Sequence, residues 1–431
     1  NFFEQPGHPY SQKLFRSVPM ADKRTQGLDV IPGIVPPLDQ PFTGCRFAER
    51  CALAEAQCHE VAPPWQGQAT QGYRCHFAEA RVETAEPSRA AVADAGSRSA
   101  TALLDVRALK VHFPIHQGVL RRVVGHVKAV DGVDVVIPAG RTLALVGESG
   151  CGKTTVGKAI LQLLRPTGGA VRFDGQDLKA LSGAALRRLR RQFQIIFQDP
   201  ASSMNPRMLV EDIVAEGMVA QGIGASREDR RQRVDALLQQ VGLPASAADR
   251  YPHEFSGGQR QRIAIARALA VEPRLIVCDE PTSALDVSVQ AQVLNLLRRL
   301  QVELGLSYLF ITHNISVVAY LADEVAVMYL GRIVEHGEVG AVLNAPQHPY
   351  TNALLSAVPV ADPQHQREVI RLEGDMPSPV DPPGGCHFHP RCPYAQPVCR
   401  ERYPEVTVLD HARRVACWRV HPDHAEAFRN T

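Results

Sequence analysis

The sequence has no hydrophobic run long enough to cross a membrane. A spanning helix needs roughly 18 or more consecutive apolar residues, and the best candidate, Ile315–Leu330, is interrupted by Asp323 and Glu324. A secretory signal peptide is also absent, because the first residues do not combine a basic segment with a following apolar one. These absences exclude a membrane-spanning or secreted protein. The chain begins at Asn1 rather than Met, which indicates a fragment.

The sequence also has little net charge of either sign. Its 47 Lys and Arg residues are balanced by 45 Asp and Glu residues, so the formal net charge is +2. That balance provides no general electrostatic attraction to nucleic acid or to anionic lipid. With 45% hydrophobic and 21% charged residues in a chain of 431, the composition is typical of an ordinary globular protein. This length suggests roughly two to four folding units.

Cysteine is not scarce, and eight of the ten cysteines form two matching sets. The sets are Cys45, Cys51, Cys58 and Cys75, and Cys386, Cys392, Cys399 and Cys417. Steps between neighbours are 6, 7 and 17 residues in the first set and 6, 7 and 18 in the second. Both copies share the pattern Gly-Cys-x-Phe-x-x-Arg-Cys and, upstream, His-Pro-Tyr beginning at His8 and His348. The offset of about 340 residues is far longer than a solenoid repeat and indicates a duplicated large unit. This chain would then hold the tail of the first copy and the whole of the second.

Between the repeats the composition changes twice. Residues 81–100 are rich in Ala, Ser and charge, which predicts a linker. From about Thr101, β-like runs alternate with helix-like ones, which predicts a mostly parallel sheet covered by helices. The segment 208–255 has no strand-like run and is predicted to be a helical insertion. The expected organisation is a first tail over 1–80, the linker over 81–100, an α/β domain over 101–345 and a second tail over 346–431.

The most specific motif is G-x-x-x-x-G-K-[ST], matched by residues 147–154. It follows the apolar run Leu143–Val146 and opens an apolar helix that is predicted to reach Leu164. Glycines let backbone N–H groups turn inward around an anion, and the helix N-terminus adds about half a positive charge. Lys153 supplies a full charge to the β and γ phosphates, and the Thr154 hydroxyl suits magnesium. The alternative is a glycine-rich turn without a ligand. The candidate nucleotide-binding residues are Gly147, Glu148, Ser149, Gly150, Cys151, Gly152, Lys153, Thr154 and Thr155.

Further along, the apolar run Leu275–Cys278 ends in two adjacent carboxylates. Unpaired charge at the end of a buried strand is costly, so these acids are expected to have a function. Asp279 is expected to hold magnesium through water, and Glu280 to polarise the attacking water as general base. The alternative is that both acids only cap the following turn.

A third motif lies between the phosphate loop and these two acids in the sequence. The sequence Ser-Gly-Gly-Gln over residues 256–259 stands before the predicted helix Arg260–Ala270 and ends 20 residues before Asp279. Together with the phosphate loop, this arrangement resembles the ATP-binding cassette of ABC transporters. The resemblance implies the P-loop NTPase fold of that family, which is α/β with a helical subdomain. Here the cassette would carry small cysteine-rich C-terminal extensions.

The resemblance implies roles for several further residues. Gln198 matches the Q-loop glutamine, which contacts magnesium and the membrane subunits. Asp286 matches the D-loop, and His313 matches the switch histidine that senses the γ-phosphate. Phe113 is the candidate aromatic that stacks on adenine, with an ordinary core role as the alternative. The implied catalytic residues are Glu280, His313 and Gln198. The implied magnesium ligands are Thr154, Gln198 and Asp279. The implied signature residues, which would contact a nucleotide, are Ser256, Gly257, Gly258 and Gln259.

Other stretches narrow the resemblance to the dipeptide and oligopeptide importer ATPases. They are Ser203–Arg207, Leu285–Gln292, Leu330–Glu335 and the tail that begins at His348. The implied function is ATP binding and hydrolysis that powers peptide import, by a peripheral subunit at the cytoplasmic face of the cell membrane. The cargo stays open between dipeptides, longer peptides, nickel and other solutes. A soluble ABC ATPase and an iron–sulfur sensing protein outside transport are the alternatives.

The family mechanism also implies partners. Two cassettes dimerise head to tail, with ATP between the phosphate loop of one and the signature motif of the other. This chain has one of each, so it needs a second cassette, either upstream of Asn1 in a tandem chain or on a separate subunit. Two transmembrane permease subunits and, indirectly, a solute-binding protein are the other implied partners. Nucleic acid is not expected to be one.

Three uses of the two cysteine sets compete. Disulfides are disfavoured, because an ABC ATPase works in the reducing cytosol. Zinc sites usually show short C-x2–4-C spacings, whereas the closest cysteines here are six residues apart. Four thiolates can hold an iron–sulfur cluster, and the resemblance implies a 4Fe–4S cluster, because some family members carry one in this tail. Zinc and unmetallated structural cysteines stay open. His8 and His348 are expected to be helix caps or packing residues.

Overall fold

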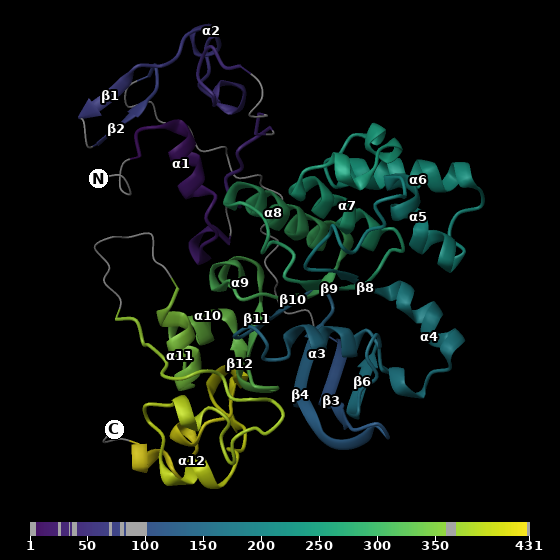
Figure 1. The fold of residues 1–431 in the computed structure, drawn as a ribbon, viewed down its shortest axis with the longest axis vertical. Helices are drawn as coiled ribbons and strands as arrows, with labels where there is room; N and C mark the ends of the chain where they lie inside the picture. Colours follow the sequence, from purple (N-terminus) through teal and green to yellow (C-terminus); the bar gives the residue numbers. More distant parts are fainter. Residues whose placement is uncertain are drawn as a thin grey trace.

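The computed structural model describes most of the chain. The described residues are 6–24, 27–33, 35–36, 41–68, 71–77, 82, 101–358 and 368–428. Apart from residue 82, the predicted linker lies outside them. No helix in these ranges is both long and apolar enough to cross a bilayer. The first repeat lies at the top of Figure 1 and the second at the bottom, with sheets and helices between them.

An eight-stranded sheet runs through the middle of the molecule, in the order β13-β14-β12-β11-β5-β10-β9-β8. Neighbouring strands from β11 to β8 are parallel, as predicted, whereas β12, β14 and β13 add antiparallel pairs. The second repeat supplies β13 and β14, so this tail extends the sheet of the cassette. The strands are β5 (Thr142–Val146), β8 (Phe193–Ile196), β9 (Leu275–Asp279), β10 (Ser307–Ile311), β11 (Glu324–Tyr329), β12 (Arg332–Glu338), β13 (Thr407–Val408) and β14 (Arg414–Val415).

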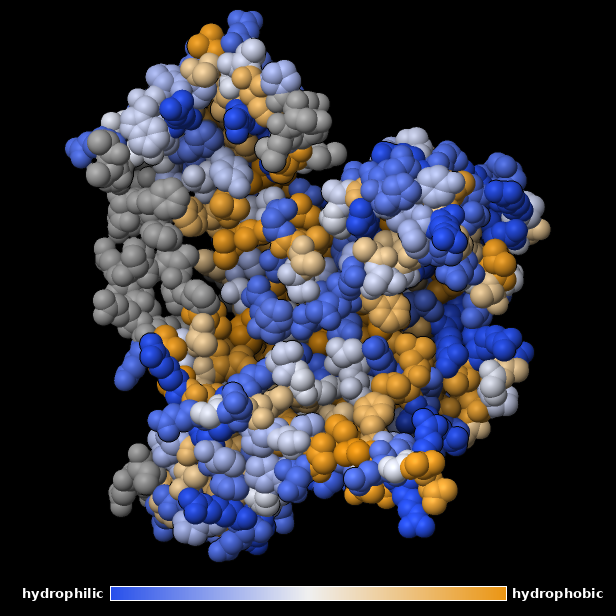
Figure 2. Space-filling view, in the orientation of Figure 1, coloured by the Kyte–Doolittle hydropathy of each residue, from blue (hydrophilic) through white to orange (hydrophobic). Residues whose placement is uncertain are grey.

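A four-stranded antiparallel sheet, in the order β4-β3-β6-β7, covers one side of α3. Its strands are β3 (Ala102–Gln117), β4 (Arg122–Pro138), β6 (Gly168–Phe173) and β7 (Gln176–Asp177). The long β3–β4 hairpin ends in Val119 and Leu120, whose exposed fractions are 100% and 78%. Apolar side chains gather at the lower edge of Figure 2, where Figure 1 shows this hairpin.

Helices cover both faces of the central sheet. α3 lies below β8–β10 in Figure 1, and α7 and α8 lie above them. The predicted helix to Leu164 is too long: α3 ends at Ile160, because Gln162 adopts a left-handed backbone with φ of 54°. The other helices of the cassette are α4 (Gly183–Leu189), α5 (Val210–Gln221), α6 (Arg227–Gln240), α7 (Gly257–Leu269), α8 (Val287–Leu304), α9 (Ile315–Leu321) and α10 (Val339–Asn344), and α3 itself spans Lys153–Ile160.

The segment 208–255, all of it described, contains helices α5 and α6 and short 3₁₀ turns but no strand. The apolar side chains of Val214, Val234 and Leu238 are fully buried and pack in one cluster with those of α7 and α8. This packing joins the helical insertion to the cassette through α7, the helix that follows the signature motif.

The first repeat packs on the cassette through a short extended segment. Leu28 and Ile31 are buried, at 5% and 0% exposure. Asn295 of α8 both accepts from the Leu28 N–H (3.2 Å) and donates to the Leu28 carbonyl (2.8 Å). The elements of this repeat are α1 (Pro9–Arg16), α2 (Ala56–Glu60), β1 (Trp65–Gln68) and β2 (Gln71–Arg74); those of the second are α11 (Pro349–Ser356), α12 (Pro397–Glu401), β13 and β14.

Candidate functional site

The phosphate loop connects β5 to α3 and surrounds a buried ammonium. Gly152 caps α3 with a φ of 108°, and a Cβ there would lie 2.2 Å from the carbonyl oxygen of Ala129. The Lys153 side chain is 5% exposed, and its Nζ donates to the carbonyl oxygens of Gly147 (2.8 Å) and Glu148 (2.9 Å). The ammonium is therefore held at the loop by two neutral carbonyl oxygens, and an anionic phosphate would be a stronger partner for it.

A hydroxyl and a carboxylate meet beside this loop. Thr154 Oγ1 donates to Asp279 Oδ1 across 2.9 Å, which joins α3 to the carboxyl end of β9. Burial raises the pKa of Asp279, Glu280 raises it further, and the Thr154 hydrogen bond opposes the shift. Hydroxyl and carboxylate oxygens are hard ligands, so this pair fits magnesium together with substrate phosphates.

Three candidate catalytic side chains converge one residue further on. Glu280 Oε2 accepts from Gln198 Nε2 (3.1 Å), and its Oε1 lies 3.2 Å from His313 Nδ1. They follow β9, β8 and β10, and the carboxyl ends of parallel strands meet at one edge of the sheet. Glu280 has a left-handed backbone, with a φ of 46°, fixed by a hydrogen bond from its N–H to the Ile311 carbonyl. Such local strain is common at functional sites, and the convergence favours a shared role over capping of the next turn.

The signature residues lie away from this site. Ser256 caps α7: its Oγ accepts from the Gln259 N–H (3.4 Å), and the Gln259 side chain accepts from the Ser256 N–H (3.0 Å). Ser256 and Gly257 are exposed, whereas Gly258 is buried against Val289. In Figure 1, α7, the helix that this motif opens, and α3 lie on opposite sides of the strands.

Two other candidate residues have clear local settings. Phe113 on β3 is 37% exposed, so the alternative of an ordinary core residue is wrong. The Asp286 carboxylate caps α8, accepting from the N–H groups of Ser288 (3.1 Å) and Val289 (3.0 Å). The contacts of Asp286 are therefore those of a helix cap within this chain.

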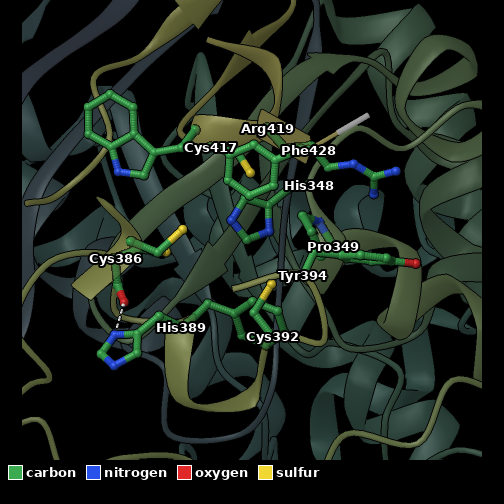
Figure 3. Close-up of a pocket in the computed structure, with 12 residues that line it drawn as sticks. His348, Pro349, Cys386, His389, Cys392, Tyr394, Cys417, Arg419 and Phe428 are labelled. Atoms are coloured by element: carbon green, nitrogen blue, oxygen red, sulfur yellow. Dashed lines mark hydrogen bonds between the residues drawn. The ribbon is translucent and has the colours of Figure 1, made fainter. Parts of the chain in front are cut away.

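Each cysteine set lines a small cavity of its own. In Figure 3 the thiols of Cys386, Cys392 and Cys417 point toward one interior, which the fourth cysteine of the set also lines. The cysteines of the first set line the matching cavity. All of these cysteines are unpaired. Burial raises the pKa of Cys386 and Cys417 to about 12 and that of Cys392 to about 11.

The metal that the resemblance implies is not supported by a preformed ligand group. In the described ranges, no three His, Cys, Asp or Glu side chains are placed to hold a metal ion. The thiols surround a common space without closing on a single point, so the donor type fits a cluster while the geometry does not fix one. As expected, His8 and His348 are helix caps: their Nδ1 atoms accept from the N–H groups of Tyr10 (3.0 Å) and Tyr350 (3.1 Å).

Two residues of the second repeat contact the phosphate loop, and the sequence did not predict their contacts. Tyr350 Oη accepts from the Glu148 N–H at 2.8 Å, and the Arg391 guanidinium lies 2.9 and 3.2 Å from the two Glu148 carboxylate oxygens. Both belong to the repeated patterns His-Pro-Tyr and Gly-Cys-x-Phe-x-x-Arg-Cys. The repetition of these patterns was the signal in the sequence that could have found them, but it did not identify Glu148 as the residue that they contact.

Two known family models match parts of this chain. The ABC transporter family model matches residues 130–283, which include the phosphate loop, Asp279 and Glu280. The model of the oligopeptide/dipeptide transporter C-terminal region matches residues 1–58 and again 334–399. The second model therefore matches both copies of the internal repeat.

Similar curated proteins are ATP-binding subunits. The oligopeptide transport ATP-binding protein AppF of Bacillus subtilis is 50% identical over 73% of this chain and 96% of its own length. The oligopeptide transport ATP-binding protein OppF of Salmonella typhimurium is 50% identical over 74% and 97%. The di/tripeptide transport ATP-binding protein DppF of Pseudomonas aeruginosa is 48% identical over 76% and 98%. A solved dimeric structure of the bacterial ABC transporter cassette MJ0796 is 28% identical over 55% of this chain and 98% of that chain, with a TM-score of 0.49.

Proposed function

This chain belongs to the ABC transporter ATPases of the oligopeptide and dipeptide family, and we propose that it powers peptide import from the cytoplasmic face of the cell membrane. It is an ATPase of the P-loop class with the α/β cassette fold. The observation that carries the site assignment is the convergence of Gln198 and His313 on the Glu280 carboxylate, one residue after Asp279. The cargo class rests on relatives that are named as oligopeptide or di/tripeptide transport proteins.

The phosphate loop would bind the nucleotide. The loop N–H groups and the Lys153 ammonium would bind the β and γ phosphates, and Phe113 would stack on the adenine. Thr154, Asp279 and Gln198 would hold magnesium, which supplies positive charge to the phosphate oxygens when bound. The other residues of the loop would contribute through their backbone: Gly147, Ser149, Gly150, Cys151, Gly152 and Thr155. Glu148 would contribute through its carbonyl, which holds the Lys153 ammonium, because its N–H already donates to Tyr350.

Hydrolysis then needs a base and a sensor. Glu280 would accept a proton from the water as the water oxygen bonds to the γ-phosphorus, while the bond to the ADP oxygen breaks. Gln198 would orient that carboxylate, and His313 would contact the γ-phosphate. The resemblance implies these roles, and the hydrogen bonds that link the three side chains support them.

A second cassette would complete the site. The exposed Ser256 and Gly257, with Gly258 and Gln259 behind them, would contact the nucleotide of the partner, aided by the positive end of α7. The partner cassette would be part of a tandem chain or a separate subunit. Two transmembrane permease subunits would receive the motion near Gln198, and a solute-binding protein would deliver the cargo to them.

The domain division we propose follows the repeats. It consists of a cysteine-rich tail over 1–80, a linker over 81–100, the cassette over 101–345 with a helical subdomain over about 208–255, and a second tail over 346–431. Pairing of β12 with β14 supports close attachment of the second tail to the cassette.

We also propose that each cysteine set holds a 4Fe–4S cluster, supported by four unpaired thiols around one cavity in each repeat. Anaerobic purification with iron, sulfide and zinc assays and an absorption spectrum tests this. Two clusters per chain are expected, and loss of one on C399S. Zinc in place of iron, or a metal-free chain, would overturn the proposal of a 4Fe–4S cluster. An iron-loaded chain without transport-linked ATPase activity would favour the sensing alternative.

The function is tested by E280Q in membranes that contain the permease subunits. ATP hydrolysis should fall at least about 100-fold, because a general base contributes about that much or more, whereas ATP binding should persist. E272Q is the matched control, since Glu272 is also an acid with a left-handed backbone (φ 56°) but lies elsewhere, paired with Arg191. Its hydrolysis and peptide uptake should match those of the wild type. Full hydrolysis by E280Q would exclude Glu280 as the base, and peptide uptake independent of ATP would overturn the transport role.

A further inference from the structure

Glu148 of the phosphate loop is bound at three separate groups, two of them by side chains of the second repeat. Arg391 Nη1 and Nη2 lie 2.9 and 3.2 Å from its two carboxylate oxygens. Its N–H donates to the Tyr350 hydroxyl at 2.8 Å, and its carbonyl accepts from Lys153 Nζ at 2.9 Å. The first turn of the loop is therefore fixed by the tail on one side and by the phosphate-binding lysine on the other.

The backbone position of Arg391 is set by the cysteine turn. Arg391 ends the 3₁₀ helix His389–Arg391, between the first two cysteines of its set. Three backbone hydrogen bonds fix this turn: His389 N–H to Cys386 O (3.0 Å), Arg391 N–H to Phe388 O (3.0 Å) and Cys392 N–H to His389 O (3.3 Å). The Arg391 side chain is only 9% exposed, so its fork is held in one orientation.

An aromatic cluster attaches the same turn to the cassette. Phe388 is 1% exposed, and its ring centroid lies 5.2 Å from that of Tyr329 and 5.5 Å from that of Tyr350. Tyr329 ends β11 and lies 6.0 Å from the Arg391 guanidinium. Tyr350 is fully buried, and its ring presents the hydroxyl to the Glu148 N–H. The tail is thus rigidly placed where it meets the loop.

The first repeat offers an internal comparison. Arg50 occupies the position of Arg391 in its own cysteine turn, but its Nε donates to the Pro32 carbonyl at 3.1 Å. Tyr10 occupies the position of Tyr350 and is 40% exposed rather than fully buried. The repeat therefore forms its turn without an acid from a phosphate loop, so the contacts with Glu148 are an addition to the fold of the tail.

The negative charge of Glu148 lies in the phosphate loop, where a polyphosphate would bind, so its neutralisation by Arg391 would affect nucleotide binding. Glu148, whose side chain is 32% exposed, lines a cleft of about 950 Å³ together with Gly147, His313 and Arg391. A free carboxylate here would repel the negative charge of a polyphosphate. Arg391 neutralises this carboxylate in a paired geometry, and charge-assisted pairs of this kind are among the stronger hydrogen bonds.

We propose that Arg391 and Tyr350 are positioning residues for the phosphate loop: they hold Glu148 toward the cysteine-rich tail, so that the affinity for ATP depends on the folded tail. The proposal rests on ATP binding at the loop. It adds to that function a physical connection between the cysteine turn and the nucleotide. Neither residue is expected to contact the phosphates.

The test is equilibrium binding of fluorescent N-methylanthraniloyl ATP and ADP to the full chain. R391M should weaken ATP binding about 10-fold, equivalent to about 1.4 kcal/mol, and ADP binding less, because ADP carries less charge. Y350F should weaken it about threefold, since the Glu148 N–H loses its acceptor. The matched controls R50M and Y10F, in the first repeat, should bind as the wild type does.

Removal of the charge on Glu148 distinguishes a positioning role of Arg391 from a general structural role. In an E148Q background, R391M should change ATP affinity less than about twofold, because no carboxylate is left to neutralise. An equal 10-fold loss in both backgrounds would overturn the proposal, as would unchanged affinity in both R391M and Y350F. If R391M does not fold, Y350F and its control still decide. Absence of ATP binding in the wild type would contradict the proposed function instead, so the two failures are distinguishable.

Discussion

The Thr154 hydroxyl donates to the Asp279 carboxylate across 2.9 Å, and this bond connects the first turn of α3 to the end of β9. The two residues are 125 positions apart in the chain. Asp279 is 4% exposed, and burial raises its pKa. A cation that binds both oxygens would replace this hydrogen bond and lower the same pKa again.

Removal of the Thr154 hydroxyl should therefore weaken magnesium binding specifically. We expect T154V, which keeps the side-chain shape, to need at least about 10-fold more magnesium for half-maximal ATP hydrolysis, because one of its few protein oxygen ligands is lost. T154S retains the hydroxyl and should need nearly the wild-type concentration. A magnesium titration of hydrolysis at saturating ATP measures both. Equal magnesium requirements for the two variants would show that the hydroxyl is not a ligand.

Gly152 should not tolerate a side chain. G152A places a Cβ 2.2 Å from the Ala129 carbonyl oxygen in a left-handed backbone, so the loop must move and nucleotide binding should be lost. G175A is the control, because Gly175 has a similar positive φ of 78° but no atom within 4 Å of the added Cβ. It should lose only about 1–2 kcal/mol of stability, the usual cost of this conformation. Calorimetric titration with ATP measures the nucleotide affinity of both variants, and thermal unfolding measures their stability. ATP binding by G152A at wild-type affinity would contradict the prediction.

The second repeat should lose stability in mild acid through His348. Burial lowers the pKa of His348 to about 3, so the folded chain keeps it neutral while the unfolded chain binds a proton below about pH 6.5. Stability therefore falls as the pH drops from about 6.5 toward 3, and the loss reaches about 1.4 kcal/mol at pH 5.5. H348N retains a side-chain acceptor for the Tyr350 N–H but has no proton to gain, so this part of the acid sensitivity should disappear.

The measurement uses the two tryptophans, one in each repeat. In a W65F background, Trp418 fluorescence reports urea unfolding of the second repeat at pH 7.5 and 5.5. H8N is the matched control, because His8 makes the same cap in the first repeat and is less buried. It should leave the Trp418 transition unchanged at both pH values. Identical acid sensitivity of H348N and the wild type would show that another group is responsible.

Asn295 should control attachment of the first repeat to the cassette. Its amide makes both backbone hydrogen bonds to Leu28 and accepts a third from the Tyr320 hydroxyl at 2.7 Å. N295A should speed hydrogen exchange at the Leu28 amide at least about 10-fold, since net hydrogen bonds contribute about 1 kcal/mol each. N205A, at an exposed turn, should leave that amide unchanged. Unaltered exchange in N295A would show that the other contacts of the segment, among them the hydrogen bond from Gln292 to the Ile31 carbonyl, hold it without Asn295.

The local motifs of this protein could be predicted from the sequence because their chemistry depends on neighbouring residues. The phosphate loop, the strand that ends in Asp279 and Glu280, the signature before α7 and the repeated cysteine pattern all lie within short segments. Helix limits were less certain: α3 ends at Ile160 rather than Leu164, because the backbone of Gln162 turns left-handed.

What only the tertiary structure decided are the contacts between segments far apart in the chain. The sequence by itself named Gln198, Glu280 and His313, but their meeting depends on which strands are neighbours in the sheet. It likewise presented Arg50 and Arg391 as equivalent members of a repeat. Folding gives Arg391 a carboxylate 243 positions away and leaves Arg50 with a backbone carbonyl. Pattern alone cannot distinguish them, because the energy of an ion pair depends on the distance and burial of its partner, and both are set by the packing of the whole chain.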